Sequence, residues 1–153
     1  MSSDGSVMLG GPNGGDNGYP HISTDGGLTW TENRGPGHGS WRGLDVSDSG
    51  RILVATSHAG EMFISGDYGQ TWKKKTGVGT GKQMLVAMSD DASKIAAAEV
   101  DGRVWTSVDF GSTWKERTEM GSGSWTAIAA SANGSSIFVS ANSGNIRKGA
   151  FGS

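Results

Sequence analysis

Three aspartates recur in one eight-residue pattern, Ser-x-Asp-x-Gly-x-Thr-Trp, and form the most regular chemical feature of the chain. They are Asp25, Asp67 and Asp109, and each lies 42 residues from the next. A carboxylate in this setting can bind a metal ion or a substrate, or it can accept hydrogen bonds from its own turn. The glycine permits a positive φ, and the tryptophan supplies a large apolar surface. We interpret the pattern as structural, with three turns held by Ser23, Asp25, Gly27, Thr29, Trp30, Ser65, Asp67, Gly69, Thr71, Trp72, Ser107, Asp109, Gly111, Thr113 and Trp114.

A second group of residues lies in the segments between repeats, which read NRGPGHGSW, KTGVGTGKQ and RTEMGSGSW. An aromatic ring beside a basic or imidazole side chain can stack a sugar ring or hold a peptide side chain. The favoured interpretation is that the tryptophans pack at the start of the innermost strand, although Gln83 shows that the position accepts a polar group and keeps ligand binding open. The candidate ligand-binding residues are Trp41, Arg42, His38, Lys82, Gln83 and Trp125.

Metal and cofactor chemistry have little support in the sequence. The first repeat contains the longer segment GGPNGGDNG, where Asn13, Asp16 and Asn17 offer oxygen ligands. A single carboxylate is a weak basis for calcium binding, so a glycine-rich hairpin is the favoured interpretation. The three histidines occur singly, and the chain has no cysteine. We therefore expect neither a metal site nor a cofactor.

The spacing of the aspartates indicates a supersecondary unit that is copied and stacked. Each unit contains short β-favouring runs separated by Ser, Asp, Asn and Gly clusters, which predicts antiparallel strands. The runs LDV, LVAM and AIAA suit an innermost strand, whereas the lysines of TWKKK suit an exposed edge. Four strands per unit predict the blade of a β-propeller and an all-β fold. In one unit the predicted strands are Trp41–Ser47, Arg51–Thr56, Glu61–Ser65 and Thr71–Lys75.

The repeat divides the chain into two complete blades, residues 35–76 and 77–118, flanked by partial blades at 1–34 and 119–153. The first partial blade lacks its innermost strand, and the last lacks its outermost strand, which predicts fourteen strands. Incomplete blades at both ends also predict that the ring closes through oligomerisation, with a homodimer of eight blades favoured over a small four-bladed ring. A start inside a repeat suggests a piece excised from, or designed on, a larger propeller.

These motifs resemble the Asp-box repeat, also called the bacterial neuraminidase repeat, and the resemblance covers essentially the whole chain. The repeat is found in sialidases, sortilin-type receptors, some glycoside hydrolases and propellers similar to photosystem II assembly factors. It implies that each box lies on the turn between the third and fourth strands of a blade. A fourth box is expected near residue 151, but the sequence there is GAFGS, so Phe151 replaces the aspartate.

The resemblance to sialidases does not extend to their catalytic residues. Such enzymes use an arginine triad and a tyrosine nucleophile with a glutamate partner, and this sequence has no FRIP-like arginine motif. Tyr68 lies inside a box, Tyr19 lies beside Pro20, and the pair Asp90–Asp91 is better explained by a turn than by acid–base chemistry. We expect a non-catalytic scaffold or binding module, with a carbohydrate-binding propeller as the alternative and a hydrolase as the least favoured function.

Composition excludes some partners. The net charge is −2 and the hydrophobic fraction is 34%, so the chain has enough apolar residues for one core but no basic field for nucleic acid. The basic run Lys73–Lys75 falls on a predicted outer strand and is interpreted as a solvated edge. No apolar run is long enough to span a membrane, and no signal peptide is visible. The expected partners are a second copy of the chain and a glycan or protein ligand.

Overall fold

Strands of the computed structural model form four antiparallel sheets, and the structure describes residues 1–13, 18–79 and 83–152. The first sheet contains β1 (Met8–Gly10), β2 (His21–Ser23) and β3 (Thr31–Glu32). The second contains β4 (Trp41–Val46), β5 (Leu53–Ser57), β6 (Met62–Ser65) and β7 (Lys73–Lys75). The third contains β8 (Met84–Met88), β9 (Ile95–Glu99), β10 (Val104–Ser107) and β11 (Lys115–Glu116). The fourth contains β12 (Trp125–Ala130), β13 (Ile137–Ala141) and β14 (Ile146–Gly149), preceded by the 3₁₀ turn η1 (Thr118–Met120).

This arrangement confirms the all-β fold class and its antiparallel sheets of three or four strands. The described residues contain fourteen strands, in the predicted order of three, four, four and three. The predicted outer strand Thr71–Lys75 is shorter in the structure, because Thr71 and Trp72 belong to the hydrogen-bonded turn before β7. No helix within the described ranges is both long and apolar enough to cross a bilayer.

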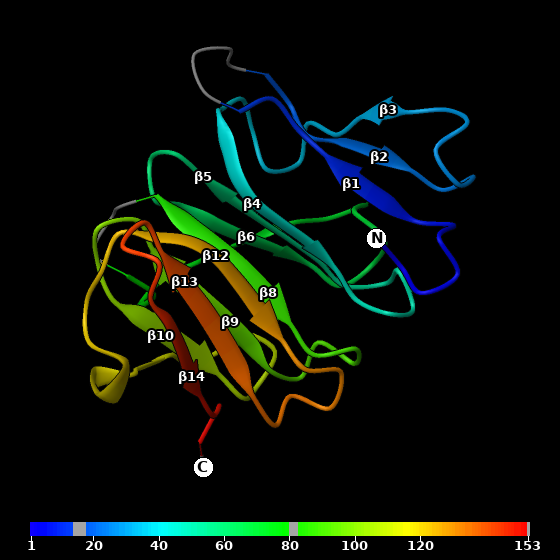
Figure 1. Cartoon of the computed structure of the whole chain (residues 1–153). Coiled ribbons are helices and arrows are strands. Elements are labelled where there is room, and N and C mark those ends of the chain that lie inside the picture. The colour runs from blue at the N-terminus through cyan, green and yellow to red at the C-terminus, as the bar shows by residue number, and fades with distance from the viewer. Residues whose placement is uncertain (14–17, 80–82, 153) are drawn as a thin grey trace.

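The first strands of successive sheets converge. Strand β4 lies against β8, and β8 lies against β12, while β1 lies against β4 (Figure 1). The approach is closest at Gly43, where an added Cβ would lie 2.9 Å from the carbonyl oxygen of Met84. The Thr56 hydroxyl bridges the two strands, because it accepts from the Gly43 N–H over 2.9 Å and donates to the Met84 carbonyl over 2.6 Å. Small residues are therefore required where sheets meet.

Apolar clusters fill the space between each pair of neighbouring sheets. Val54 and Met62 of the second sheet face Val86 and Ile95 of the third sheet. An equivalent cluster joins the third sheet to the fourth, and a smaller one joins the first sheet to the second. Each sheet thus covers its neighbour through the same repeat positions. Figure 1 shows the sheets as a fan, with β1–β3 and β12–β14 at its two ends.

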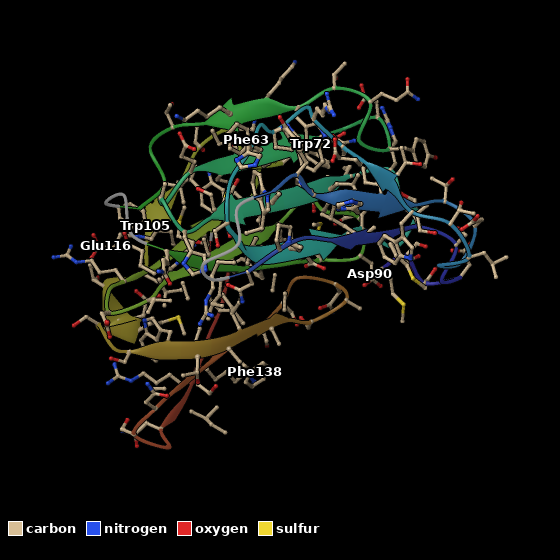
Figure 2. The ribbon with its side chains drawn as sticks, turned by 90° about the horizontal axis from the view of Figure 1, so that it is seen from above. Phe63, Trp72, Asp90, Trp105, Glu116 and Phe138 are labelled. Atoms are coloured by element: carbon tan, nitrogen blue, oxygen red, sulfur yellow. The ribbon has the colours of Figure 1, made fainter. Side chains whose placement is uncertain are left out.

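Backbone hydrogen bonds also link the turns that precede β1, β5, β9 and β13. The N–H of Ser3 donates to the carbonyl of Asp48, the N–H of Asp48 to that of Asp90, and the N–H of Asp90 to that of Ala132. The distances are 3.0, 2.9 and 2.9 Å. We call this series the turn ladder; Asp90 marks its place in Figure 2. Equivalent residues form every rung, so each sheet has the same orientation relative to the next one.

Candidate binding surface

The second aspartate pattern forms a closed set of hydrogen bonds between β6 and β7. Asp67 accepts from the Ser65 hydroxyl over 2.8 Å, from the Thr71 N–H over 2.8 Å and from the Thr71 hydroxyl over 2.6 Å. The Ser65 hydroxyl accepts from the Gly69 N–H, and the Trp72 indole N–H donates to the Gly69 carbonyl. The donors to the Asp67 carboxylate and the Ser65 hydroxyl therefore all come from the same eight residues.

The other two patterns repeat the hydrogen bonds of the aspartate, although the indole N–H of Trp114 has no partner among the described residues. Asp25 accepts from the hydroxyls of Ser23 and Thr29, and Asp109 accepts from those of Ser107 and Thr113. Hydrogen bonds from the threonine lower the pKa of Asp25 to about 2, and they do the same for Asp67. The pKa of Asp109 is also lowered by Thr113. These carboxylates are ionised at neutral pH and engaged in their turns, so they are unsuited to act as general acids.

At the position of the fourth aspartate, the ring of Phe151 is buried, with 2% of its surface exposed. It packs in the cluster between the third and fourth sheets, with Val104 and Ile137 among its neighbours. Gly152 has a φ of 67°, close to the 57° of Phe110 at the equivalent place in the third box. At this position the chain therefore replaces the carboxylate of a box with a buried apolar side chain.

The candidate residues Trp41 and Trp125 are 2% and 1% exposed. Each indole N–H donates over 3.0 Å to the carbonyl of a glycine in the preceding sheet, Gly18 for Trp41 and Gly102 for Trp125. Stacking a sugar requires an open ring face, which neither indole has. Both tryptophans are therefore packing residues, which was the favoured interpretation of the sequence.

The remaining candidates do not gather into one site. His38 is exposed, with its ring 5.1 Å from that of Tyr19. Arg42 lies at a bulge in β4, and its buried Nε has no hydrogen-bond partner among the described residues. Gln83 is half-buried, and its carbonyl accepts from the Val100 N–H over 2.7 Å. Lys82 lies outside the described residues.

Pockets nevertheless form beside both buried tryptophans. The Trp41 pocket has a volume of about 360 Å³ and the Trp125 pocket about 320 Å³. They occupy equivalent places two repeat periods apart, where the loop into a first strand meets the turn between the second and third strands. The Trp41 pocket is lined by Pro36, His38, Gly39, Ser40, Trp41, Ser57, His58, Ala59 and Glu61. The Trp125 pocket is lined by Ser122, Gly123, Ser124, Trp125, Ala141, Asn142, Ser143, Asn145 and Arg147.

The two pockets share a framework but differ in their polar groups. In both, a residue after the second strand donates its N–H to the loop: His58 to the Ser40 carbonyl over 2.7 Å, and Asn142 to the Ser124 carbonyl over 3.1 Å. The Trp41 pocket adds imidazole and carboxylate groups, whereas the Trp125 pocket adds amides and the guanidinium of Arg147, 5.7 Å from the Trp125 ring. One position of the repeat therefore carries a different chemistry in each blade.

Sequence reasoning did not identify several of these pocket residues. Four of them lie in or after the turn between the second and third strands of a blade: Glu61, Asn142, Asn145 and Arg147. Aligning this turn across the repeats would have identified them from the sequence. His58 was considered only as an isolated histidine, yet its Nε2 lies 2.6 Å from Oδ1 of Asn13. The proposed calcium ligands Asp16 and Asn17 lie outside the described residues. Among the described residues, no group of three His, Asp or Glu side chains is suited to a metal.

Comparison with protein families matches residues 21–32 to the BNR/Asp-box repeat. Among solved structures, the chain is similar to the GH74 enzyme of Niastella koreensis, with a TM-score of 0.64 and 23% identity over 86% of this chain and 20% of that one. It is also similar to an ancestral GH74 enzyme, with a TM-score of 0.63 and 17% identity over 90% of this chain and 20% of that one. The structure of YCF48 bound to D1 peptide has a TM-score of 0.55 and 19% identity over 86% of this chain and 44% of that one.

The chain therefore spans less than half the length of these structural neighbours, and the likeness concerns the fold alone. No curated protein matches the sequence. The family match falls on the first of three turns that share the hydrogen bond from threonine to aspartate, and the neighbours share the arrangement of sheets. Residues 21–32 therefore carry an Asp-box repeat, and the antiparallel sheets of the chain have a β-propeller-like arrangement.

Proposed function

We propose that this chain is a non-catalytic binding module whose loop face binds an extended protein segment. One observation carries the proposal: the Trp41 and Trp125 pockets recur at the same repeat position with different polar linings. A repeated pocket lets one polymer place side chains in both pockets, which lie two blades apart. Variation of the lining from blade to blade then sets the sequence that is bound.

A peptide suits these pockets better than a glycan. The indoles are buried, which removes the aromatic platform that sugar binding would use. The Trp41 pocket instead offers the Glu61 carboxylate and two imidazoles, and the Trp125 pocket offers amides and a guanidinium. Such groups match the charged and amide side chains of a protein segment. The similar YCF48 structure contains a bound D1 peptide, which supports this class of ligand by analogy of fold.

A hydrolytic role has weaker support despite the GH74 neighbours. Hydrolysis of a glycosidic bond needs a carboxyl group that can donate a proton near neutral pH. The box carboxylates have lowered pKa values and are bonded to their own threonines. Tyr19 lies against His38 and beneath Arg34, and Tyr68 is part of a box turn. These roles favour binding over catalysis.

The test is a selection from a displayed peptide library, followed by affinity measurements on pocket variants. Asn145→Ala and Asn142→Ala change the Trp125 pocket, and Glu61→Ala changes the Trp41 pocket. Asp48→Ala, at the opposite ends of the strands, is the matched control. We expect a selected peptide to bind at least one pocket variant about tenfold more weakly, which corresponds to roughly 1.4 kcal/mol, and the control with unchanged affinity.

Two results would contradict the proposal. A library that yields no peptide above background would contradict the proposal that the ligand is a peptide. If all three pocket variants bind the peptide as tightly as the wild type, the pockets are not the binding site. A glycan array probed with the same variants identifies the competing function. Glycan binding that depends on Asn142 and Asn145 would assign the face to carbohydrate recognition instead.

A further inference from the structure

The last sheet exposes apolar side chains at repeat positions that are buried in the sheets before it. Val54 of the second sheet and Ala96 of the third are both 0% exposed, because the following sheet covers them. The equivalent residue of the fourth sheet, Phe138, is 41% exposed. Figure 2 shows Phe138 on the far side of the molecule from Phe63 of the second sheet. This face has the composition of an internal junction but lacks a covering sheet.

At a second repeat position the difference in exposure between the last sheet and the earlier sheets is larger. Met62 and Val104 are 0% exposed, whereas their equivalent Ile146 is 73% exposed. Lys148 takes the place of Ile64, which is 8% exposed. Together Phe138, Ile146 and Lys148 define what we call the tail face. An exposed pair of large apolar residues at positions built for burial marks an interaction surface.

The first sheet exposes the complementary surface. Within the first two internal junctions, the following sheet contributes its box tryptophan, and Trp72 and Trp114 are half-buried against the preceding sheet. The equivalent Trp30 is 46% exposed, and Leu28 beside it is 86% exposed. Met8 is half-buried, although its equivalents Leu53 and Ile95 are 0% exposed. We call Met8, Leu28 and Trp30 the head face.

The turn ladder has a donor at one end and an acceptor at the other. Every rung runs from the N–H of one sheet to the carbonyl of the next, and the last rung ends at the Ala132 carbonyl. Within the described parts of the chain, neither the Ala132 N–H nor the Ser3 carbonyl makes a bond of this kind. Both residues are exposed. One further rung would join Ala132 to a residue equivalent to Ser3.

We propose that the tail face of one copy of this chain binds the head face of a second copy. Each junction then repeats the geometry found between the internal sheets, with Phe138 and Ile146 covered by Trp30 and its neighbours. The Ala132 N–H donates to the Ser3 carbonyl of the other copy. Two such junctions close a ring of eight sheets, which is within the typical propeller range of about four to eight blades.

Charge supports the same pairing. In the second junction of the chain, Gly111 of the following box lies against Ile64, since an added Cβ would be 2.4 Å from Ile64 Cδ1. The corresponding contact between copies would bring Lys148 beside the Gly27 turn and the ionised Asp25. Lys148 of the tail face would therefore meet the carboxylate of Asp25, which lies next to the head face.

The test is the solution mass by light scattering over a dilution series. Wild-type protein is expected at twice 15.8 kDa. The tail variant Phe138→Glu/Ile146→Glu and the head variant Leu28→Glu are each expected at 15.8 kDa. Trp30→Glu is a second head variant. Val108→Glu, at an exposed apolar residue outside both faces, is the control and should leave the dimer intact. Circular dichroism confirms that each variant is folded.

Mixing the variants tests the direction of the contact. A tail variant keeps its head face, and a head variant keeps its tail face, so the mixture should form a dimer with one intact junction. A wild-type monomer at every concentration would overturn the proposal. A dimer that survives the head variants but not the tail variant would also overturn it, because that pattern requires tail-to-tail pairing.

Discussion

The carboxylate of Asp45, on β4, accepts a hydrogen bond from the N–H of Met88, on β8, over 2.8 Å. This bond joins the innermost strands of two sheets at a partly buried position. Burial raises the pKa of Asp45 from its ordinary value of 3.8, although the bonds from Val46 and Met88 oppose the effect. The folded chain therefore holds this proton more tightly than the unfolded chain does. Its contribution to stability is complete below pH 3.8 and is lost as the pH rises through the folded pKa.

Asp45→Asn should therefore flatten the pH dependence of unfolding above pH 4. The amide oxygen can still accept from Met88, and no charge is buried. We expect the variant to match or exceed the urea midpoint of the wild type at pH 7. A variant whose stability still declines with the wild-type slope between pH 4 and 7 would contradict this role for Asp45.

Thr56→Val should weaken the contact between β4 and β8. The substitution preserves shape but leaves the Gly43 N–H and the Met84 carbonyl without the bridging hydroxyl. Buried groups without partners cost about 1–3 kcal/mol in free energy of unfolding. Thr56→Ser keeps the hydroxyl and should lose less. Denaturant unfolding of both variants measures the difference, and equal losses would show that the hydroxyl bridge is unimportant.

Asp67→Asn should reduce stability at neutral pH and change how stability depends on pH under acidic conditions. The folded pKa of Asp67 is about 2, against 3.8 for the ordinary group. The stabilisation is therefore present above about pH 4 and is lost as the pH falls through 2. The variant should lose part of this acid dependence, whereas Asp90→Asn on an exposed turn should retain it. Urea midpoints measured from pH 7 to pH 2 provide the comparison.

Phe110→Gly should stabilise the third box turn by up to about 1 kcal/mol, because a non-glycine residue in the left-handed region costs roughly 1–2 kcal/mol. Phe110 has a φ of 57°, and the equivalent residue of the first box is Gly26. The ring is 51% exposed, so little burial is lost. Val108→Gly in the same turn lacks this strain and should destabilise. A lower melting temperature for Phe110→Gly would mean that the ring contributes more than its exposure suggests.

Phe151→Ala should destabilise the fourth sheet by about 3 kcal/mol, the usual cost of removing a buried phenylalanine ring. Phe151→Asp restores the box aspartate in sequence but would place a carboxylate in the cluster of Val104 and Ile137. We therefore expect the aspartate to be no better than alanine. Thermal unfolding measures both variants, and a stabilising Phe151→Asp would show that the cluster accommodates a carboxylate.

The repeat predicted the sheets because its information is local. Ser65, Asp67 and Thr71 form their turn within one octapeptide, so spacing alone located the strands on either side. The pockets depend on contacts between segments that are far apart in sequence. Asn142 meets Ser124 only after the fourth sheet has folded, and a pattern of residue types does not encode that meeting.

The tryptophans illustrate the same limit. Trp41 and Trp125 carry a sequence signal that suits both stacking and packing, and the deciding partners are the carbonyls of Gly18 and Gly102 in the neighbouring sheet. The sequence does not indicate which backbone carbonyls accept these bonds, except that a glycine allows the indole to approach the backbone closely. The packing role therefore became visible only with the sheets in place.

The self-contained box has a consequence for how such a chain can grow. Within the second box, the carboxylate of Asp67 accepts its hydrogen bonds from Ser65 and Thr71. A tandem duplication of the gene segment would therefore bring each new hairpin with its own complete turn. Only the residues between blades would have to adapt, which leaves selection free to alter contacts and pockets one blade at a time.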